Sequence, residues 1–483
     1  ARTIRRALQV EDENLYNLSL YVGTYANSQS ILESNLQKIE SVLISSGLTV
    51  IRANFRQEQS FRATLPFLEN DKDISKMISR NVLTSGLVST YPFVSNELFD
   101  KNGVLVGTNS FDKSIVMLDR FDTKKYKNAN MFVLGTSGSG KSYFVKLMIN
   151  RNRFLDINQF VIDPDREYKS LCTSLNGIYI NFGINQSINI FDIREYELED
   201  GESYLMNKIS KLNTFFSLIF TDMSDEDKSL LEEKIIEVYL KKGITKDNNT
   251  LYIENENSLL RKKEFIKSIN MPKMQDLYDL LKKDKKLKKY ATILKPYVLG
   301  SLKYLNEYTN FDINNKLVVV DVNEINEKDM PIVMFVVTEY FWDIIKKDRS
   351  KKKILYLDEV WKMINKNEQT ADFVFKLFKT IRKYGGAATA ITQDVSDFFM
   401  LEDGKYGKGI LNNSNIKCMF QLEETDIKHL ENIINLSDEE KIQLINMKRG
   451  TALIHAGRNT LVCNIVSSEK EHSFITSEFI NAN

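Results

Sequence analysis

The fold is decided by residues 130–142, which read NMFVLGTSGSGKS. An apolar strand, Met131–Leu134, runs directly into the pattern G-x-x-x-x-G-K-[ST], and a helical pattern, Tyr143–Arg151, follows it. This order of strand, glycine-rich loop and helix is the context that a phosphate-binding loop requires. The glycines permit backbone angles and a close approach that a Cβ atom would forbid. The stretch therefore predicts backbone N–H groups that face a β-phosphate at a helix N-terminus.

Two side chains of this loop have predicted chemical roles. The ammonium of Lys141 supplies positive charge to the β- and γ-phosphates, and the hydroxyl of Ser142 is a ligand for Mg²⁺. With 20 glycines in 483 residues, the four fixed positions match by chance in roughly one chain in a hundred. We predict ATP and Mg²⁺ as ligands, and the predicted nucleotide-binding residues are Gly135, Thr136, Ser137, Gly138, Ser139, Gly140, Lys141, Ser142 and Tyr143.

Short apolar runs alternate with helical patterns along much of the chain. They are uninterrupted by polar residues and bounded by polar ends, which is typical of parallel strands buried on both faces. The runs are Met131–Leu134, Phe160–Ile162, Leu317–Val320, Ile354–Leu357 and Ala387–Ile391. This alternation predicts an α/β fold with a doubly wound, mostly parallel sheet.

The strand pattern stops between residues 196 and 312, where apolar residues recur at helical spacing. We predict an all-helical insertion there, which divides a P-loop core into residues 106–195 and 313–483. Residues 1–105 predict a small N-terminal α/β domain. Its expected features are a strand at Tyr16–Val22, a helix capped by Ser30, a strand at Leu48–Phe55, and a hairpin across Asn102-Gly103 between Leu98-Phe99 and Val104–Val106.

The amino-acid composition excludes several classes of protein. Hydrophobic residues make up 42% and charged residues 27%, which is typical of a globular protein and excludes a disordered chain, a collagen and a disulfide scaffold. Because 66 Lys+Arg nearly cancel 65 Asp+Glu, a protein dedicated to wrapping duplex DNA is disfavoured. The three cysteines and three histidines form neither a disulfide framework nor a zinc pattern, which favours the cytoplasm. Lysine runs at 282–289 and 346–353 favour solvated helix faces over DNA or membrane contacts.

No membrane span is predicted from this sequence. The most apolar long stretch, Ile332–Ile345, is interrupted by Glu339 and Asp343 and is shorter than the roughly 18–20 residues a span needs. No signal peptide is evident. The chain opens on Ala-Arg-Thr without Met, so we expect a fragment of a longer protein, whose missing residues could hold a membrane anchor.

A second apolar strand ends in two carboxylates, Asp358 and Glu359. Because ligands of open parallel sheets bind beyond the carboxyl ends of the strands, we predict that Asp358 holds Mg²⁺ and Glu359 orients and deprotonates the attacking water. The alternative is favourable charge at a helix N-terminus. Asp321 and Asp163 also follow apolar runs, but each lacks the Asp-Glu doublet, and residues 163–167 are predicted to form the rim of the site.

The strand Ala387–Ile391 leads to Gln393, whose amide is predicted to contact the γ-phosphate or the attacking water. Eleven positions earlier, Arg382 is a candidate arginine finger that projects into a neighbouring subunit. Taken by spacing alone, Arg382 fits better as a helix C-terminal cation, a role that Lys383 could serve equally. Arg449, beside the turn at Gly450, is the second finger candidate and is added to the predicted nucleotide-binding residues.

With these residues, the chain resembles the VirB-four (TraE-like) family of traffic ATPases of type IV secretion and conjugation systems. The resemblance covers most of the chain. It rests on the phosphate loop and on the stretches Val161–Tyr168, Asn189–Asp192, Leu357–Trp361, Thr392-Gln393 and Arg449-Gly450. The stretches Phe55–Glu58 and Asn96–Phe99 look like the versions in conjugative elements of Gram-positive bacteria. Position 190 is Ile, where relatives often have Pro.

The resemblance implies a RecA-like core that forms hexamers, with Arg382 acting in trans. It also implies an ATPase that docks on the cytoplasmic, inner face of the membrane, against channel subunits of a conjugation system, and powers channel assembly or substrate transfer. Contact with DNA or a relaxase is weakly supported. Two alternatives stay open at this point: a DNA-translocating coupling protein related to HerA and FtsK, and an assembly scaffold that binds nucleotide with little turnover.

Overall fold

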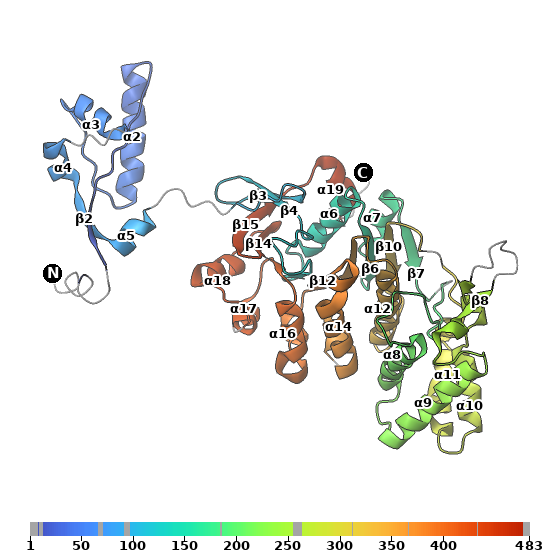
Figure 1. Cartoon of the computed structure of the whole chain (residues 1–483). Coiled ribbons are helices and arrows are strands. Elements are labelled where there is room, and N and C mark those ends of the chain that lie inside the picture. Colours follow the sequence, from blue (N-terminus) through green and yellow to red (C-terminus); the bar gives the residue numbers. More distant parts are fainter. Residues whose placement is uncertain are drawn as a thin grey trace, which may run out of the picture. The chain divides into compact units, whose positions relative to one another are not determined.

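The computed structural model describes residues 8, 13–65, 71–90, 97–183, 186–254, 263–311, 313–365, 367–431 and 433–476. Asn96, the first residue of one stretch quoted above, lies outside these ranges, as do the opening residues Ala1 to Thr3. The chain divides into two compact units, Ala1–Ser95 and Asn96–Asn483. We describe each unit by itself (Figure 1).

The larger unit is built on an eleven-stranded sheet. The spatial order of its strands is β4 (Ile115–Leu118), β3 (Val104–Asn109), β15 (Asn459–Ile465), β14 (Thr451–Ala456), β13 (Ile416–Met419), β5 (Met131–Leu134), β12 (Gly386–Thr392), β11 (Lys353–Leu357), β6 (Asn158–Asp163), β10 (Leu317–Asp321) and β7 (Ile178–Asn181). From β13 to β7 all neighbours run parallel, while β13, β14, β15, β3 and β4 pair antiparallel. The predicted α/β fold with a mostly parallel sheet is confirmed.

Helices cover both faces of the sheet, so its central strands bury every side chain. In β5, Phe132 and Leu134 belong to one hydrophobic core, while Met131 and Val133 belong to the other. Burial on two faces explains why the central strands read as continuous apolar runs. The helices of the larger unit outside the insertion are α6 (Lys141–Arg153), α7 (Lys169–Ser174), α12 (Met330–Lys347), α13 (Trp361–Ile364), α14 (Glu368–Thr380), α15 (Val395–Phe398), α16 (Lys405–Asn412), α17 (Glu424–Glu431), α18 (Asp438–Ile445) and α19 (Glu469–Ile475).

The insertion consists mainly of four helices, α8 (Tyr204–Ile219), α9 (Asp225–Leu240), α10 (Met274–Lys283) and α11 (Lys288–Leu299) (Figure 1). Ser224 caps α9 by accepting a hydrogen bond from the backbone N–H of Asp227, as the spacing predicts. The insertion also contains a short antiparallel ribbon, β8 (Tyr252–Glu254) with β9 (Lys263–Phe265), which the helical periodicity did not reveal. No helix within the described ranges is long and apolar enough to cross a membrane.

The smaller unit pairs β1 (Leu15–Leu18) with β2 (Arg80–Leu83) in an antiparallel ribbon. Its helices are α2 (Gln29–Ser45), α3 (Gln57–Thr64), α4 (Lys72–Ile78) and α5 (Thr84–Ser89). Three expectations here were wrong in detail. The first strand is shorter than Tyr16–Val22, α2 is capped by Ser28 rather than Ser30, and the predicted strand Leu48–Phe55 does not form. With few buried partners, local alternation is a weak determinant of a strand.

The predicted hairpin across Asn102-Gly103 is also wrong. The turn exists, since the backbone N–H of Gly103 donates to the Asp100 carbonyl over 2.8 Å. However, β3 pairs with the following strand β4 on one edge and with the distant strand β15 on the other. Phe99 forms only an isolated bridge with Met117 of β4. Long-range pairing with β15 therefore outweighs the local hairpin signal.

Candidate nucleotide site

The glycine-rich loop leaves β5 at Leu134 and enters α6 at Lys141. Its three glycines have left-handed backbone angles, with φ of 154° at Gly135, 77° at Gly138 and 112° at Gly140. A Cβ atom at Gly135 would lie 2.6 Å from the Cβ of Phe420, so only glycine fits there. At Gly138 no atom lies within 4 Å of a built Cβ, so this part of the loop is open. The loop thus has the shape of a cradle that a phosphate can occupy.

Lys141 is buried at the start of α6, and its ammonium donates a hydrogen bond to the Thr136 carbonyl over 2.9 Å. Burial lowers its pKa, and the nearby carboxylates of Glu359 and Asp358 oppose that shift. Within the described part of the chain the ammonium has no ion pair within 4 Å. A buried cation held only by a carbonyl, beside an open cradle, is a suitable partner for a phosphate group.

Asp358 lies just beyond the end of β11, between the ends of β6 and β12. Its carboxylate accepts hydrogen bonds from the Tyr168 hydroxyl over 2.9 Å and from the backbone N–H of Glu359 over 3.0 Å. Burial raises its pKa well above the ordinary value, and the negative charges of Glu359, Asp163 and Glu167 add to that rise. A buried carboxylate with too little positive charge around it fits a divalent cation, and the predicted hydroxyl ligand, Ser142, lies in the first turn of α6.

Glu359 is also buried, and its backbone is left-handed, with φ of 45°. The indole N–H of Trp361 donates a hydrogen bond to its carboxylate. Burial raises its pKa, while the indole hydrogen bond and the charges of Lys141 and Lys362 lower it. A carboxylate held near the phosphate loop with a raised pKa is suited to take a proton from water.

Asp163 organises the predicted rim. Its carboxylate accepts the backbone N–H groups of Glu167 and Tyr168 over 3.0 and 2.9 Å, and burial raises its pKa to about 6. Asp321 of β10 pairs in register with Asp163 of β6. Its carboxylate accepts hydrogen bonds from the Arg166 guanidinium over 2.7 Å and from the Tyr179 hydroxyl over 2.6 Å. The structure therefore gives both competing strand-end carboxylates local partners. The sequence reasoning missed Tyr168 as a partner of Asp358, because nothing local connects the two.

Gln393 lies at the same edge of the sheet as the phosphate loop. The residue before it, Thr392, pairs with Leu134 in the parallel strand β5, so Gln393 is adjacent in register to Gly135. Its side chain is exposed. The register therefore brings Gln393 beside the loop, and its contact with the γ-phosphate or the attacking water stays a prediction.

The two arginine candidates occupy opposite edges. Arg382 precedes β12, so it lies at the amino end of this strand, whereas the carboxyl end of β12 is beside the phosphate loop. The guanidinium of Arg382 donates a hydrogen bond to the Lys127 carbonyl. Arg449 precedes Gly450, whose backbone N–H donates to the Ser139 carbonyl over 3.2 Å. Within one chain, Arg449 is therefore next to the loop and Arg382 is not.

Tyr143 follows Ser142 in the first turn of α6. Its phenol contacts the Ser467 hydroxyl and, over 3.0 Å, Nδ1 of His472 in α19. The side chain thus links α6 to the C-terminal helix rather than facing the loop. Only its backbone N–H, in the first turn of α6, faces the same way as the loop amides.

The stretch Asn189–Asp192 precedes the insertion and contacts its later part. The Asp192 carboxylate accepts hydrogen bonds from the hydroxyls of Ser268 over 2.7 Å and Thr309 over 2.6 Å. The side chain of Asn189 donates to the Pro272 carbonyl over 2.9 Å. These contacts tie the insertion to the segment that leads into it.

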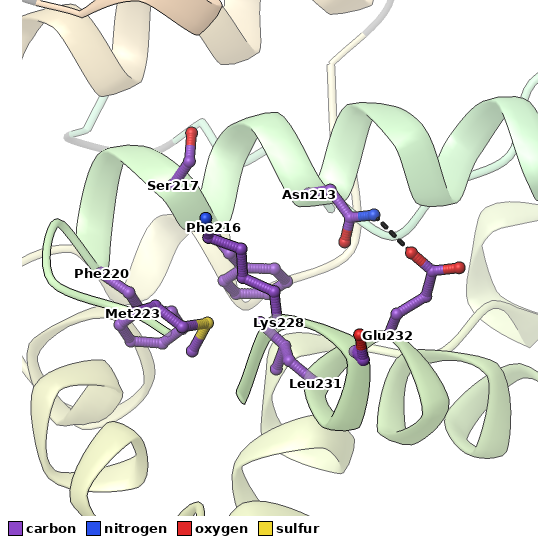
Figure 2. A pocket seen from close by; sticks show the side chains of 9 residues that line it. Asn213, Phe216, Ser217, Phe220, Met223, Lys228, Leu231 and Glu232 are labelled. Carbon is purple, nitrogen blue, oxygen red and sulfur yellow. Dashed lines mark hydrogen bonds between the residues drawn. The ribbon is translucent and has the colours of Figure 1, made fainter. Parts of the chain in front are cut away.

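A cavity of about 180 Å³ lies within the insertion, between α8 and α9 (Figure 2). Its wall is mostly apolar, and Asn213 donates to Glu232 at one end over 2.8 Å. The lining residues are Asn213, Phe216, Ser217, Phe220, Met223, Lys228, Ser229, Leu231 and Glu232. None of the predicted site residues lines it, so the nucleotide site is a different feature.

The lysine run of the insertion is partly neutralised by the start of α9. Lys286 pairs with Glu226 over 2.6 Å, and Lys289 pairs with Asp227 over 3.0 Å. Exposed pairs of this kind contribute little to stability. They do reduce the positive charge that a nucleic acid would meet.

Comparisons with known proteins agree with this geometry. Residues 110–469 match the model of the TraG P-loop domain. Protein TraC of Escherichia coli (strain K12) is 22% identical over 437 residues, which cover 84% of this chain and 45% of TraC. The chain therefore spans less than half the length of this curated relative.

The solved structure of a VirB4 protein has the same fold. The structure of VirB4 of Thermoanaerobacter pseudethanolicus matches with a TM-score of 0.70 and 28% identity, covering 78% of this chain and all of that one (100%). The plasmid coupling protein TrwB, in complex with a non-hydrolysable ATP analogue, matches with a TM-score of only 0.44 and 15% identity over 70% of this chain and 86% of TrwB. The TrwB likeness is too weak to support a functional comparison.

Proposed function

The chain belongs to the TraG P-loop domain family, and from that premise we propose that it is the ATP-hydrolysing motor of a type IV secretion or conjugative transfer apparatus. In this role it energises channel assembly or substrate transfer. The single observation that carries the proposal is the gathering of Lys141, Asp358 and Glu359 at one edge of the sheet, within reach of each other's charge. Its likeness to TraC and VirB4 supports the same role.

Each residue of the site has a separate role in the proposed reaction. The loop amides and Lys141 bind the β- and γ-phosphates, Glu359 takes a proton from the attacking water, and Gln393 contacts the γ-phosphate. Asp358 and Ser142 would hold Mg²⁺, which neutralises charge on the phosphates when bound. Hydrolysis therefore depends mainly on electrostatic stabilisation by groups that are already buried.

We further propose that the active form is a ring, most simply a hexamer, in which the site is shared. Arg449 completes the site in its own chain, since the turn at Gly450 contacts the phosphate loop. Arg382 lies at the opposite edge of the sheet, so it reaches a phosphate only in a neighbouring subunit. The ring would sit on the inner face of the membrane against channel subunits. The pairing of the insertion's lysines with Glu226 and Asp227 weighs against the alternative of a DNA-pumping motor.

The test is the ATPase rate against protein concentration for the wild type, for Arg382→Ala, for Glu359→Gln and for their mixture. We expect a rate per subunit that climbs with concentration, little activity in either variant, and partial recovery in the mixture. Lys383→Ala is the matched control, because Lys383 is the neighbouring exposed cation, and it should behave as wild type. A rate independent of concentration, with no recovery, would contradict the shared site. A rate near zero in every preparation would favour a nucleotide-binding scaffold.

A further inference from the structure

The indole of Trp361 donates a hydrogen bond to the carboxylate of Glu359, two residues earlier in the chain. We propose that Trp361 is a positioning residue, whose N–H holds the Glu359 carboxylate in the place from which it deprotonates water. The inference rests on the proposed function, which assigns that step to Glu359. Nothing in the local pattern of the strand end predicts it, because a tryptophan after two acids reads as ordinary helix core.

The backbone of Glu359 is held firmly in an unfavourable conformation. A φ of 45° lies in the left-handed region, which non-glycine residues rarely adopt. Its N–H donates to the Asp358 carboxylate over 3.0 Å, and its carbonyl accepts from the N–H of Lys362 over 3.0 Å. The next N–H, of Val360, donates to the Ile391 carbonyl over 3.1 Å. The direction in which the side chain leaves the backbone is therefore set.

The end of the side chain depends on Trp361. In the part of the chain that the structure describes, the indole is the one hydrogen-bond donor to the Glu359 carboxylate. Lys141 and Lys362 attract this carboxylate, and Asp165 repels it. Without the indole, no hydrogen bond from a described residue holds the Glu359 carboxylate against rotation toward the ammonium of Lys141 or of Lys362.

Trp361 is itself well supported. It begins α13, and its ring packs against the larger hydrophobic core. The ammonium of Lys362 lies 5.9 Å from the ring centre and also pairs with Asp165 over 3.2 Å. An indole has one donor and no acceptor, so the bond has a single direction, from the ring to the acid.

The first test is Trp361→Phe, which keeps an aromatic ring and removes the N–H group. We expect kcat to fall about ten- to a hundredfold, with the Kd for ATP changed less than about twofold, because a displaced base slows the chemical step and leaves phosphate binding intact. The matched control is Trp342→Phe in α12, at the only other tryptophan of the sequence, whose ring packs against Tyr384. Equal losses in both variants, or a loss confined to ATP affinity, would overturn the proposal.

A double-mutant cycle separates positioning from general support of α13. Glu359→Asp keeps a carboxylate but shortens the side chain, so it should no longer reach the indole. If Trp361 acts through Glu359, adding Trp361→Phe to Glu359→Asp should cause no further loss of kcat. Losses that multiply would show that Trp361 acts independently of Glu359, which would contradict the proposal.

A spectroscopic measurement tests the contact without relying on turnover. In Trp342→Phe, Trp361 is the sole indole, so the ultraviolet resonance Raman band that reports indole N–H hydrogen bonding belongs to it alone. We expect this band to indicate a strong bond, and to move toward weaker bonding when Glu359→Ala is added. An unmoved band would overturn the proposal even in an active enzyme. A band that moves in a protein that hydrolyses no ATP would instead refute the proposed function and leave the contact established.

Discussion

The hydroxyl of Tyr168 donates a hydrogen bond to the Asp358 carboxylate over 2.9 Å, although 190 positions separate the two residues. Tyr168 follows β6 and Asp358 follows β11, and these strands are parallel neighbours, so both residues reach the same edge of the sheet. The two side chains are buried together. The contact shows how the segment after Asp163 supports the proposed metal ligand.

Tyr168→Phe should raise the Mg²⁺ concentration needed for half-maximal ATPase rate by about tenfold, because partners that orient a ligand typically contribute 10- to 100-fold to metal affinity. The measurement is a MgCl₂ titration at saturating ATP. Tyr179→Phe is the matched control, since that phenol contacts Asp321 over 2.6 Å instead. An unchanged titration in Tyr168→Phe would contradict this role.

Lys141→Ala should weaken ATP binding by about a hundredfold, because it removes a charged partner of the phosphates from a buried site. Calorimetric titration with ATP measures the effect. Lys417→Ala is the control: that half-buried lysine also donates to a backbone carbonyl over 2.9 Å, but it pairs in register with Phe132 inside β5 and not with the loop. If both variants bind ATP equally well, the loop is not the nucleotide site.

Asp163 should make the protein more stable as the pH falls toward about 4. Burial raises its folded pKa to about 6, above the ordinary value of 3.8. The folded chain therefore binds the proton of Asp163 more tightly than the unfolded chain does. Above pH 6 the buried carboxylate is charged and destabilises the fold. This destabilisation is lost as the pH falls from about 6 toward 3.8, because the folded chain takes up the proton. We expect the unfolding free energy of wild type relative to Asp163→Asn to be about 2 kcal/mol more favourable at pH 4.5 than at pH 7. Urea denaturation at both pH values measures this difference, and a difference independent of pH would contradict the assigned pKa.

Arg449→Ala should reduce ATP affinity about tenfold at every protein concentration, because Arg449 lies beside the loop of its own chain. Binding of a fluorescent ATP analogue, at dilute and concentrated protein, measures the effect. Arg458→Ala, in the turn between β14 and β15, is the control and should bind as wild type. A loss seen only at high concentration would move Arg449 to the subunit interface.

Sequence patterns identified the features that depend on residues close together in the chain. The glycine spacing of residues 135–140 specifies its loop, since each of the three glycines adopts a backbone angle that favours glycine. The apolar runs identified the central strands, because a strand buried on both faces needs apolar residues throughout. In the smaller unit the same reasoning failed at Leu48–Phe55, where burial is slight and alternation therefore carries little information.

The sequence by itself determined the phosphate loop, the α/β class and the acidic strand end at Asp358, because these depend on spacing within a few residues. Only the tertiary structure decided which arginine lies beside the loop within one chain, and which side chains form hydrogen bonds with the acids. Arg449 and Tyr168 reach the site through strand order and register, which arise from pairings between segments far apart in the chain. Such pairings are chosen by how the whole sheet buries its faces, so no local pattern around either residue encodes them.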